Sequence, residues 1–301
     1  MAKNKTGIAE SSNVVTSLRE TPDSKKSNTI NRKTIRSKLK DVPETLLWTL
    51  HNRANEAKRA DRIIQDPKAI EIYERIDYDY ERSFGKAEPS HAVRSMLFDK
   101  ELIQFIKENP EGIIINLGEG LETQRFRIES TKNIWYSIDV FESIEIREQF
   151  IKPDEFHKHL PLSAFNKKWI FQIPKDKPVM ITAQGLLMYF EEEKVKWLIN
   201  TIAARFSTAV FMFDTIPRWF SNKTIKGMKK TEYYKTPKMP WGINRNEIRQ
   251  KLCQWEPRIS SIKEIAYQFP RGESKLVFSI AGMIPVLKNM MPTMIKLQFK
   301  S

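Results

Sequence analysis

The sequence is poor in cysteine and glycine, and it has no long apolar run. Among its 301 residues there is one cysteine, Cys253, which excludes an intramolecular disulfide and a metal site built from several cysteines. No apolar run approaches the ~18 residues that indicate a membrane-spanning helix, and the first residues lack the apolar core of a secretory signal. We therefore expect a cytoplasmic protein that binds no metal and has no membrane contact.

Positive charge is unevenly distributed along the chain. The formal net charge is +14, with ten Lys and Arg against three Asp and Glu in residues 1–40, and seventeen against five in residues 216–301. A basic protein can bind nucleic acid, but the sequence has no RNP-like motif, zinc-finger spacing or basic recognition helix. We do not expect nucleic acid as the main partner. The basic C-terminal third is either a solvated face or an attraction for an acidic substrate.

The composition divides the chain into a tail and a single domain. Residues 1–40 contain few large apolar side chains, which predicts a disordered basic tail. Residues 41–301 are expected to form the domain, beginning with a helical region at 41–111. Apolar spacing and proline positions there predict helices within 41–59, 66–76 and 90–110.

From residue 112 onward, short β-branched runs alternate with helical patterns. Such alternation predicts a parallel sheet with helical crossovers, hence an α/β fold. The core is expected at 112–215, followed by an insertion at 216–245 and by a C-terminal helix and closing strands at 246–301. Strands are predicted at 112–117, 133–139, 178–183 and 207–214, helices at 140–150 and 191–206, and an antiparallel closing pair at 261–269 and 274–283.

Two glycines follow the first predicted strand, in "IIINLGEGLETQRFRI" (113–128). Gly118 and Gly120 allow a tight turn and close approach of a ligand to the main chain. Thr123 stands where a nicotinamide-dinucleotide fingerprint has its third glycine, which weakens that interpretation. Asp139 ends the second strand, where a carboxylate can accept hydrogen bonds from ribose hydroxyls or cap the next helix. These residues indicate a nucleoside ligand without a pyrophosphate site.

Three motifs in order carry a resemblance to a known family: "INLGEGLETQRFRI", "WYSIDVFESIEIRE" and "ITAQGLLMYF". The chain resembles the leucine carboxyl methyltransferase-like family of S-adenosylmethionine (SAM)-dependent O-methyltransferases, and most of all its bacterial branch of tetracenomycin-type polyketide O-methyltransferases. The resemblance implies a class I methyltransferase fold: a Rossmann-like, seven-stranded sheet with an antiparallel last strand, a helical N-terminal extension and a lid-like insertion.

The resemblance also implies a cofactor site. Gly118 and Gly120 would approach the methionine part of SAM, and Asp139 would hold its ribose. Arg94 would reach the cofactor carboxylate with its guanidinium fork; from the sequence alone, Arg94 is equally a surface arginine on an amphipathic helix. Gln184, followed by Gly185, stands where the wider family often has a glutamate, and it keeps hydrogen-bonding capacity without the charge.

Some residues near this site keep two interpretations. Glu119 departs from the small residue common between the glycines, and its carboxylate would face the cofactor's ammonium group or solvent. Leu187, Met188 and Tyr189 line the cofactor pocket or belong to the core. Asp214 faces the substrate or caps a turn.

The insertion at 216–245 mixes aromatic and basic side chains. It is typical of a lid that presents apolar surface and positive charge to an acidic or aromatic substrate; the alternative is a segment that packs on its own domain. The residues expected near the acceptor are Trp219, Phe220, Tyr233, Tyr234 and Trp241.

We therefore expect an enzyme, a SAM-dependent O-methyltransferase that acts on a carboxylate or hydroxyl of a small, acidic or aromatic metabolite. An ionised carboxylate needs no general base, and no catalytic residue is evident. His157 and His159 are interpreted as a surface pair. The alternatives are a protein carboxyl methyltransferase and a non-catalytic module that binds nucleotides or nucleic acid with the basic tail. The sequence does not indicate the oligomeric state.

Overall fold

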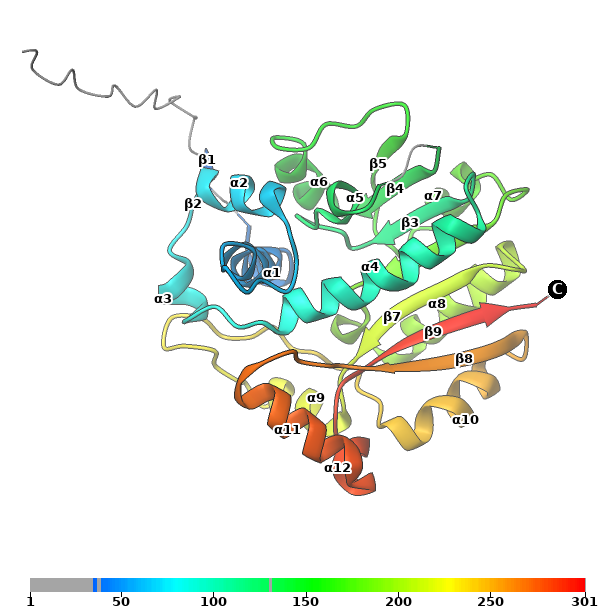
Figure 1. Ribbon diagram of the computed structural model, residues 1–301. Helices are drawn as coiled ribbons and strands as arrows, with labels where there is room; N and C mark the ends of the chain where they lie inside the picture. The colour runs from blue at the N-terminus through cyan, green and yellow to red at the C-terminus, as the bar shows by residue number, and fades with distance from the viewer. Residues whose placement is uncertain (1–34, 37–38, 130–131, 301) are drawn as a thin grey trace, which may run out of the picture. The chain divides into compact units, whose positions relative to one another are not determined.

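A seven-stranded sheet forms from the apolar runs of the second half of the chain (Figure 1). The computed structural model describes residues 35–36, 39–129 and 132–300. The strand order is β5-β4-β3-β6-β7-β9-β8, and β9 runs antiparallel to the other six strands of this sheet. This is the expected class I methyltransferase topology. The strands are β3 (Ile113–Leu117), β4 (Ile134–Asp139), β5 (His157–Pro161), β6 (Val179–Ala183), β7 (Val210–Thr215), β8 (Ile259–Ala266) and β9 (Thr293–Phe299).

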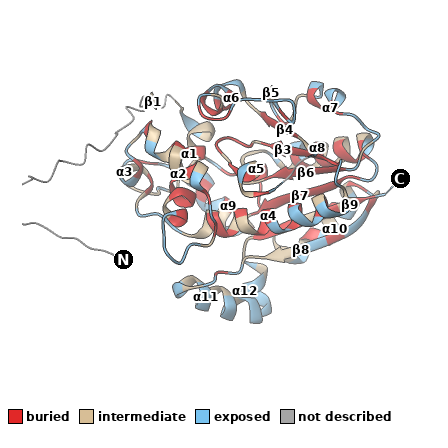
Figure 2. Cartoon of the chain, turned by 45° about the horizontal axis from the view of Figure 1, so that its top comes forward, coloured by how far each residue is buried: buried red, intermediate tan, exposed pale blue. Residues whose placement is uncertain are grey.

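Successive residues of the central strands pack on opposite faces of the sheet, because side chains alternate along a strand. Ile113 and Ile115 of β3 share one core with α8 (Glu192–Arg205), whereas Ile114 lies in a second core with α4 (Ser90–Glu108). Helices therefore cover both faces, which explains why β3 and β6 are buried along their whole length (Figure 2).

The region before the sheet is helical, as expected. Its helices are α1 (Asp41–Ala57), α2 (Pro67–Arg75), α3 (Tyr80–Phe84) and α4. The remaining helices are α5 (Gln124–Arg127), α6 (Phe141–Arg147), α7 (Lys168–Gln172), η1 (Leu187–Tyr189), α9 (Arg218–Ile225), α10 (Arg245–Trp255), α11 (Gly272–Met283) and α12 (Pro285–Asn289).

The predicted closing pair is half wrong. Residues 261–269 overlap β8, but residues 274–283 lie in α11, and the antiparallel strand is β9 at Thr293–Phe299. A short apolar run does not by itself distinguish a strand from a helix. The alternation of buried Ile295, Leu297 and Phe299 in β9 is the signal that identifies the true strand.

The expectation of a disordered tail at 1–40 falls largely outside the described residues. Within the described part, Ile35–Arg36 form β1 and pair in parallel with β2 (Ile76–Asp77). In the described part of the chain, no helix combines the length and apolar character needed to cross a bilayer.

A buried ion network ties the N-terminal helices to the turn after β3. Arg53 of α1 and Arg127 of α5 both bind the carboxylates of Asp66 and Glu122, at 2.7–3.1 Å. Arg127 also binds Asp99 of α4 at 2.7 Å. Because Glu122 directly follows the glycine turn, the network fixes the helical region against the carboxyl edge of the sheet.

Candidate functional site

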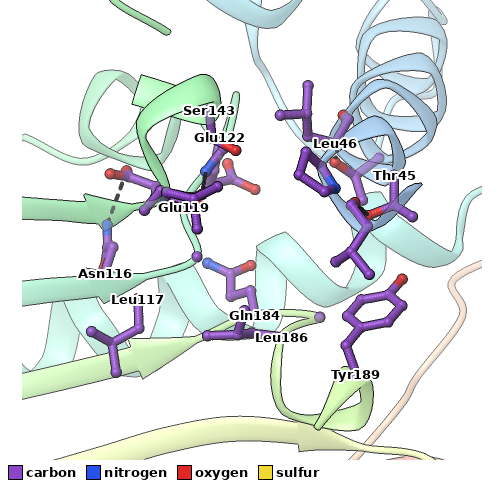
Figure 3. A pocket seen from close by; sticks show the side chains of 18 of the residues that line it. Thr45, Leu46, Asn116, Leu117, Glu119, Glu122, Ser143, Gln184, Leu186 and Tyr189 are labelled. Carbon is purple, nitrogen blue, oxygen red and sulfur yellow. Dashed lines mark hydrogen bonds between the residues drawn. The ribbon is translucent and has the colours of Figure 1, made fainter. Parts of the chain in front are cut away.

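A cavity of about 270 Å³ lies at the carboxyl ends of β3, β4 and β6 (Figure 3). This is the edge at which open α/β sheets bind ligands, and the volume is near the lower end of the ~300–1,000 Å³ usual for ligand pockets. The first half of α1 forms the opposite wall. The lining residues are Val42, Pro43, Thr45, Leu46, Thr49, Arg94, Asn116, Leu117, Gly118, Glu119, Gly120, Glu122, Asp139, Val140, Ser143, Thr182, Gln184, Gly185, Leu186, Tyr189 and Phe190.

The glycine turn needs its glycines for conformation and for space. Gly118 and Gly120 have φ angles of 63° and 52°, which side-chain-bearing residues rarely adopt. A Cβ on Gly118 would lie 2.6 Å from the Leu186 side chain, and one on Gly120 would lie 3.1 Å from Leu46. The turn therefore brings its main chain to the cavity surface while Leu46 and Leu186 pack against it.

Asp139 links the end of β4 to this turn. Its Oδ2 accepts a hydrogen bond from the Gly120 N–H (2.8 Å), and its Oδ1 accepts one from the Val140 N–H (2.7 Å). Burial raises the pKa of the carboxyl to about 6, although both N–H groups favour the charged form. Each oxygen retains a lone pair, so the carboxylate can also accept hydrogen bonds from ribose hydroxyls.

Arg94 enters the cavity from α4 and is paired with Asp214 at the end of β7. Its Nη1 lies 3.1 Å from Asp214 Oδ2, and the Gly185 N–H donates to Asp214 Oδ1 at 2.5 Å. The Arg94 Nε has no hydrogen-bond partner among the described residues. The guanidinium is thus held in place with a donor to spare, which suits a ligand carboxylate. Asp214, for which two roles were open, anchors both Arg94 and Gly185.

Gln184 follows β6, and its side chain projects toward the middle of the cavity (Figure 3). Its Oε1 is buried and has no partner within the described structure. An amide in this state can accept a hydrogen bond from a bound molecule.

Glu119 lines the cavity but is buried, so the solvent-facing position, one of the two that were predicted, is wrong. Its Oε1 accepts a hydrogen bond from Asn116 Nδ2 (3.0 Å) and lies 3.2 Å from Arg147 Nη2. The carboxyl group therefore turns toward the interior beneath the glycine turn rather than toward solvent (Figure 3), and its burial raises its pKa. Glu119 supports the turn from below.

All seven residues predicted for the cofactor line this single cavity: Arg94, Gly118, Glu119, Gly120, Asp139, Gln184 and Gly185. Sequence reasoning missed the contribution of α1, since nothing local indicates that this helix folds back onto the glycine turn. Of the three residues left open after β6, Tyr189 lines the cavity, whereas Leu187 and Met188 are buried outside its lining.

The five aromatic residues predicted for the acceptor do not line the cavity. Tyr234 packs edge-on against Phe84 and Trp48, and Trp241 is buried in the core beside Phe213. Trp219, Phe220 and Tyr233 also lie outside the lining, and Trp219 and Tyr233 are exposed. Much of the insertion packs on its own domain, which was the alternative interpretation.

His157 and His159 are not the surface pair that was predicted. His157 is fully buried and lies 2.6 Å from the Ser137 hydroxyl, while His159 contacts Glu148 at 3.1 Å. Burial lowers the pKa of His157 to about 2 and that of His159 to about 4. Both imidazoles are therefore neutral at pH 7 and lie outside the cavity lining. Within the described residues, no cluster of His, Cys, Asp and Glu is arranged to hold a metal ion.

The cavity residues fit the cofactor implied by the motifs. Three polar groups converge on one space beside the glycine turn. The Asp139 carboxylate suits a ribose, the fixed Arg94 guanidinium suits an amino-acid carboxylate, and the Gln184 amide has no partner within the described residues. The chemistry of this donor set matches a nucleoside joined to an amino acid, and it offers no cluster of cations for a pyrophosphate.

Comparisons with known proteins place the chain in a methyltransferase family. A family model described as leucine carboxyl methyltransferase matches residues 47–203, just over half of the chain. The tetracenomycin polyketide synthesis O-methyltransferase TcmP of Streptomyces glaucescens is 27% identical over 185 residues, which are 60% of this chain and 68% of that protein. The S-adenosyl-L-methionine-dependent methyltransferase dpfgK of Gibberella zeae is 25% identical over 187 residues, 56% of this chain and 62% of that protein.

Solved structures of low sequence identity are also similar. A putative methyltransferase from Thermobifida fusca YX has 9% identity and a TM-score of 0.49, covering 91% of this chain and 97% of that one. Magnesium protoporphyrin IX methyltransferase from Synechocystis PCC 6803, solved with bound SAH, has 9% identity and a TM-score of 0.45, covering 86% and 100%.

Proposed function

This chain belongs to the leucine carboxyl methyltransferase family of SAM-dependent enzymes, and we propose that it methylates an oxygen atom, most readily a carboxylate, of a small acidic or aromatic metabolite. The observation that carries the proposal is the convergence of Asp139, Arg94 and Gln184 on one cavity beside the glycine turn. The relative of polyketide synthesis supports a small metabolite as the acceptor.

The cofactor site follows from the groups described above. We assign the ribose hydroxyls to Asp139, the amino-acid carboxylate to Arg94, and the main chain of Gly118 and Gly120 to close contact with the methionine part. Bound SAM supplies an electrophilic methyl group on a sulfonium. The protein then has to align the acceptor with that methyl group and exclude water, which is the main contribution of an enzyme to such a displacement.

The cavity favours an acceptor that is already ionised. Its lining contains no histidine and no lysine, and its carboxylates are engaged by backbone N–H groups or buried ion pairs. A carboxylate acceptor is charged at pH 7 without help from a base, whereas a phenol with a pKa near 10 is not. Burial raises the pKa of Tyr189, so its hydroxyl stays protonated and can donate a hydrogen bond to the acceptor.

The test is transfer of a radiolabelled methyl group from SAM to aromatic carboxylic acids, to phenols that lack a carboxyl group, and to a peptide with a C-terminal leucine. Mild alkali releases labelled methanol from a methyl ester but leaves a methyl ether intact, so the product identifies the acceptor atom. We expect alkali-labile label on the aromatic acids, and none with Asp139→Ala.

Two outcomes would support the alternatives. Label on the peptide alone would indicate protein carboxyl methylation. Tight binding of S-adenosylhomocysteine (SAH) without any transfer, together with retention on DNA that disappears when residues 1–40 are removed, would indicate the non-catalytic binding module.

A further inference from the structure

Helices α11 and α12 form a hairpin that buries none of its residues (Figure 2). It connects β8 to β9 and is anchored by Phe278, whose ring lies 4.6 Å from that of the buried Phe269. Its large apolar side chains are otherwise exposed by 41–73%: Leu276, Val277, Ile280, Met283, Ile284, Val286 and Leu287, with Met290 directly after the hairpin. An apolar surface of this kind marks an interaction site.

The tip of the hairpin is the most apolar part. Residues 283–287, Met-Ile-Pro-Val-Leu, run from the end of α11 into α12, and Met283 and Val286 are 73% and 70% exposed. Connections between helices are usually polar, and a run of exposed apolar residues is unfavourable in water unless it serves a function. No described segment covers this tip.

Exposed lysines lie on the apolar hairpin and on the neighbouring helix α9 (Arg218–Ile225). Lys275 and Lys288 lie on it, and Glu273 is its one acidic residue. The Trp219 indole of α9 donates a hydrogen bond to the Met290 carbonyl at 2.8 Å, so α9 adjoins the end of α12. Helix α9 has no acidic residue, and Lys223 and the following Lys226 are exposed without an ion pair to any described residue.

We propose that the α11–α12 hairpin docks on an anionic lipid surface. The tip inserts its apolar side chains among the acyl chains while the flanking lysines bind anionic headgroups, and the exposed Trp219 suits the interface between them. A second copy of the chain would bring two positively charged surfaces together, which disfavours a dimer. A protein groove would cover one side of a helix, whereas exposed apolar side chains lie on both helices here and on the connection between them.

Such docking needs no membrane-spanning segment. The lack of a long apolar run, from which we expected no membrane contact, therefore does not argue against it. The hairpin begins where β8 ends and returns where β9 begins. Both points lie at the edge of the sheet that carries the cavity, since β8 runs parallel to β3 and β6. The docked surface and the cavity mouth therefore share one end of the molecule.

The experiment is sedimentation of the full chain with vesicles of phosphatidylcholine alone and of phosphatidylcholine mixed with phosphatidylserine. We expect binding to the mixed vesicles that weakens as salt is added, because the attraction between exposed charges is screened. Val286→Asp should weaken binding about tenfold or more, since a charge would enter the apolar layer. Lys275→Gln combined with Lys288→Gln should weaken it less.

The matched control is Phe171→Ser, which removes another side chain of similar exposure, 72%, from α7 on a different part of the chain. We expect it to bind vesicles as the unmodified protein does. Equal binding by Val286→Asp would overturn the proposal and assign the affinity to another basic segment. Lack of binding by the unmodified chain, or self-association in light scattering that Val286→Asp abolishes, would overturn it as well.

Discussion

At the scale of single residues, the Asp139 carboxyl changes its charge within about one pH unit of neutrality. Burial raises its pKa from 3.8 to about 6, so below pH 6 the free protein carries a neutral carboxyl that is a poorer acceptor for ribose hydroxyls. We expect the affinity for SAH to fall up to tenfold per pH unit below about pH 6, as calorimetric titration from pH 5 to 8 would show.

Ionisation of Asp139 has the opposite effect on the stability of the protein without cofactor. Because the folded pKa lies above the unfolded value, ionisation of Asp139 costs folding free energy as the pH rises from about 4 to 6.

The variant Asp139→Asn tests the assignment of the binding effect to this carboxyl. It should bind SAH more weakly and lose the pH dependence of binding between about pH 4 and 6. A pH dependence that survives in Asp139→Asn would assign the titration to another group.

Substitution of Gly185 tests how closely the Arg94 guanidinium packs against the turn after β6. Its φ is 64°, and an added Cβ would lie 2.5 Å from Arg94 Nη1, which Asp214 holds in place. We expect Gly185→Ala to lower the free energy of unfolding by about 1–2 kcal/mol, because alanine is strained in the left-handed conformation. The added methyl group should also displace Arg94 and thereby weaken SAH binding. Urea unfolding and calorimetry would measure the two effects.

Gly272 offers a matched control, because its φ is 73° and nothing lies within 4 Å of an added Cβ. Gly272→Ala should show the conformational cost alone and bind SAH normally. If both variants bind SAH equally well, the close packing of Gly185 against Arg94 has no influence on the cofactor site.

The residues that line the cavity after the strands could be predicted from the sequence, because they sit in motifs directly after those strands. Once "GIIINL" and "PVMITA" are recognised as neighbouring parallel strands, Gly118 and Gln184 must meet at one edge. The aromatic residues of the insertion had no such constraint. Whether Trp241 faces a ligand or the core depends on contacts with distant segments, here Phe213 of β7, and local sequence does not encode those contacts.

At the scale of secondary-structure elements, the buried ion network holds α1, α4 and α5 together. Replacing Arg127 by methionine would leave Asp66, Asp99 and Glu122 buried with Arg53 as their remaining cation. Breaking a buried network in this way typically costs about 3–5 kcal/mol. We expect that loss in urea unfolding of Arg127→Met at pH 7, and a smaller loss at acid pH, where carboxyls are protonated.

Arg125, on the same helix, provides the comparison. It pairs with Asp154 at 3.0 Å, but the two side chains are 23% and 47% exposed. Exposed pairs contribute at most about 1 kcal/mol, so Arg125→Met should be nearly neutral. Similar losses for the two variants would show that the network contributes no more than a surface pair.

At the scale of the whole molecule, the order of the sheet depends on which C-terminal segment is its last strand. Ile295 of β9 is fully buried, whereas Ile280 of α11 is 44% exposed. Ile295→Ala should therefore cost about 2–5 kcal/mol and Ile280→Ala no more than about 0.5 kcal/mol, measured by urea unfolding. A larger loss for Ile280→Ala than for Ile295→Ala would indicate that residues 274–283 form the closing strand.

The parallel half of the sheet could be predicted because its strands are continuous apolar runs between clear helices. The antiparallel end could not, since residues 274–283 are as apolar as a buried strand yet remain exposed in the hairpin. A surface that is apolar for docking and a segment that is apolar for packing have the same composition. The two differ only in what covers them, and the local sequence pattern carries no information on that.

The position of β9 also has a consequence for how the protein is made. β9 follows all the other strands in the chain, yet it lies inside the sheet, between β7 and β8. During synthesis, β7 therefore keeps an open edge until residues 293–299 have left the ribosome, although the strands that precede the cavity residues emerged long before. The nascent chain thus exposes one unpaired edge of an apolar strand for the time needed to translate about eighty residues, several seconds at common elongation rates. In that interval β7 is a ready partner for chaperones and for other unfinished chains.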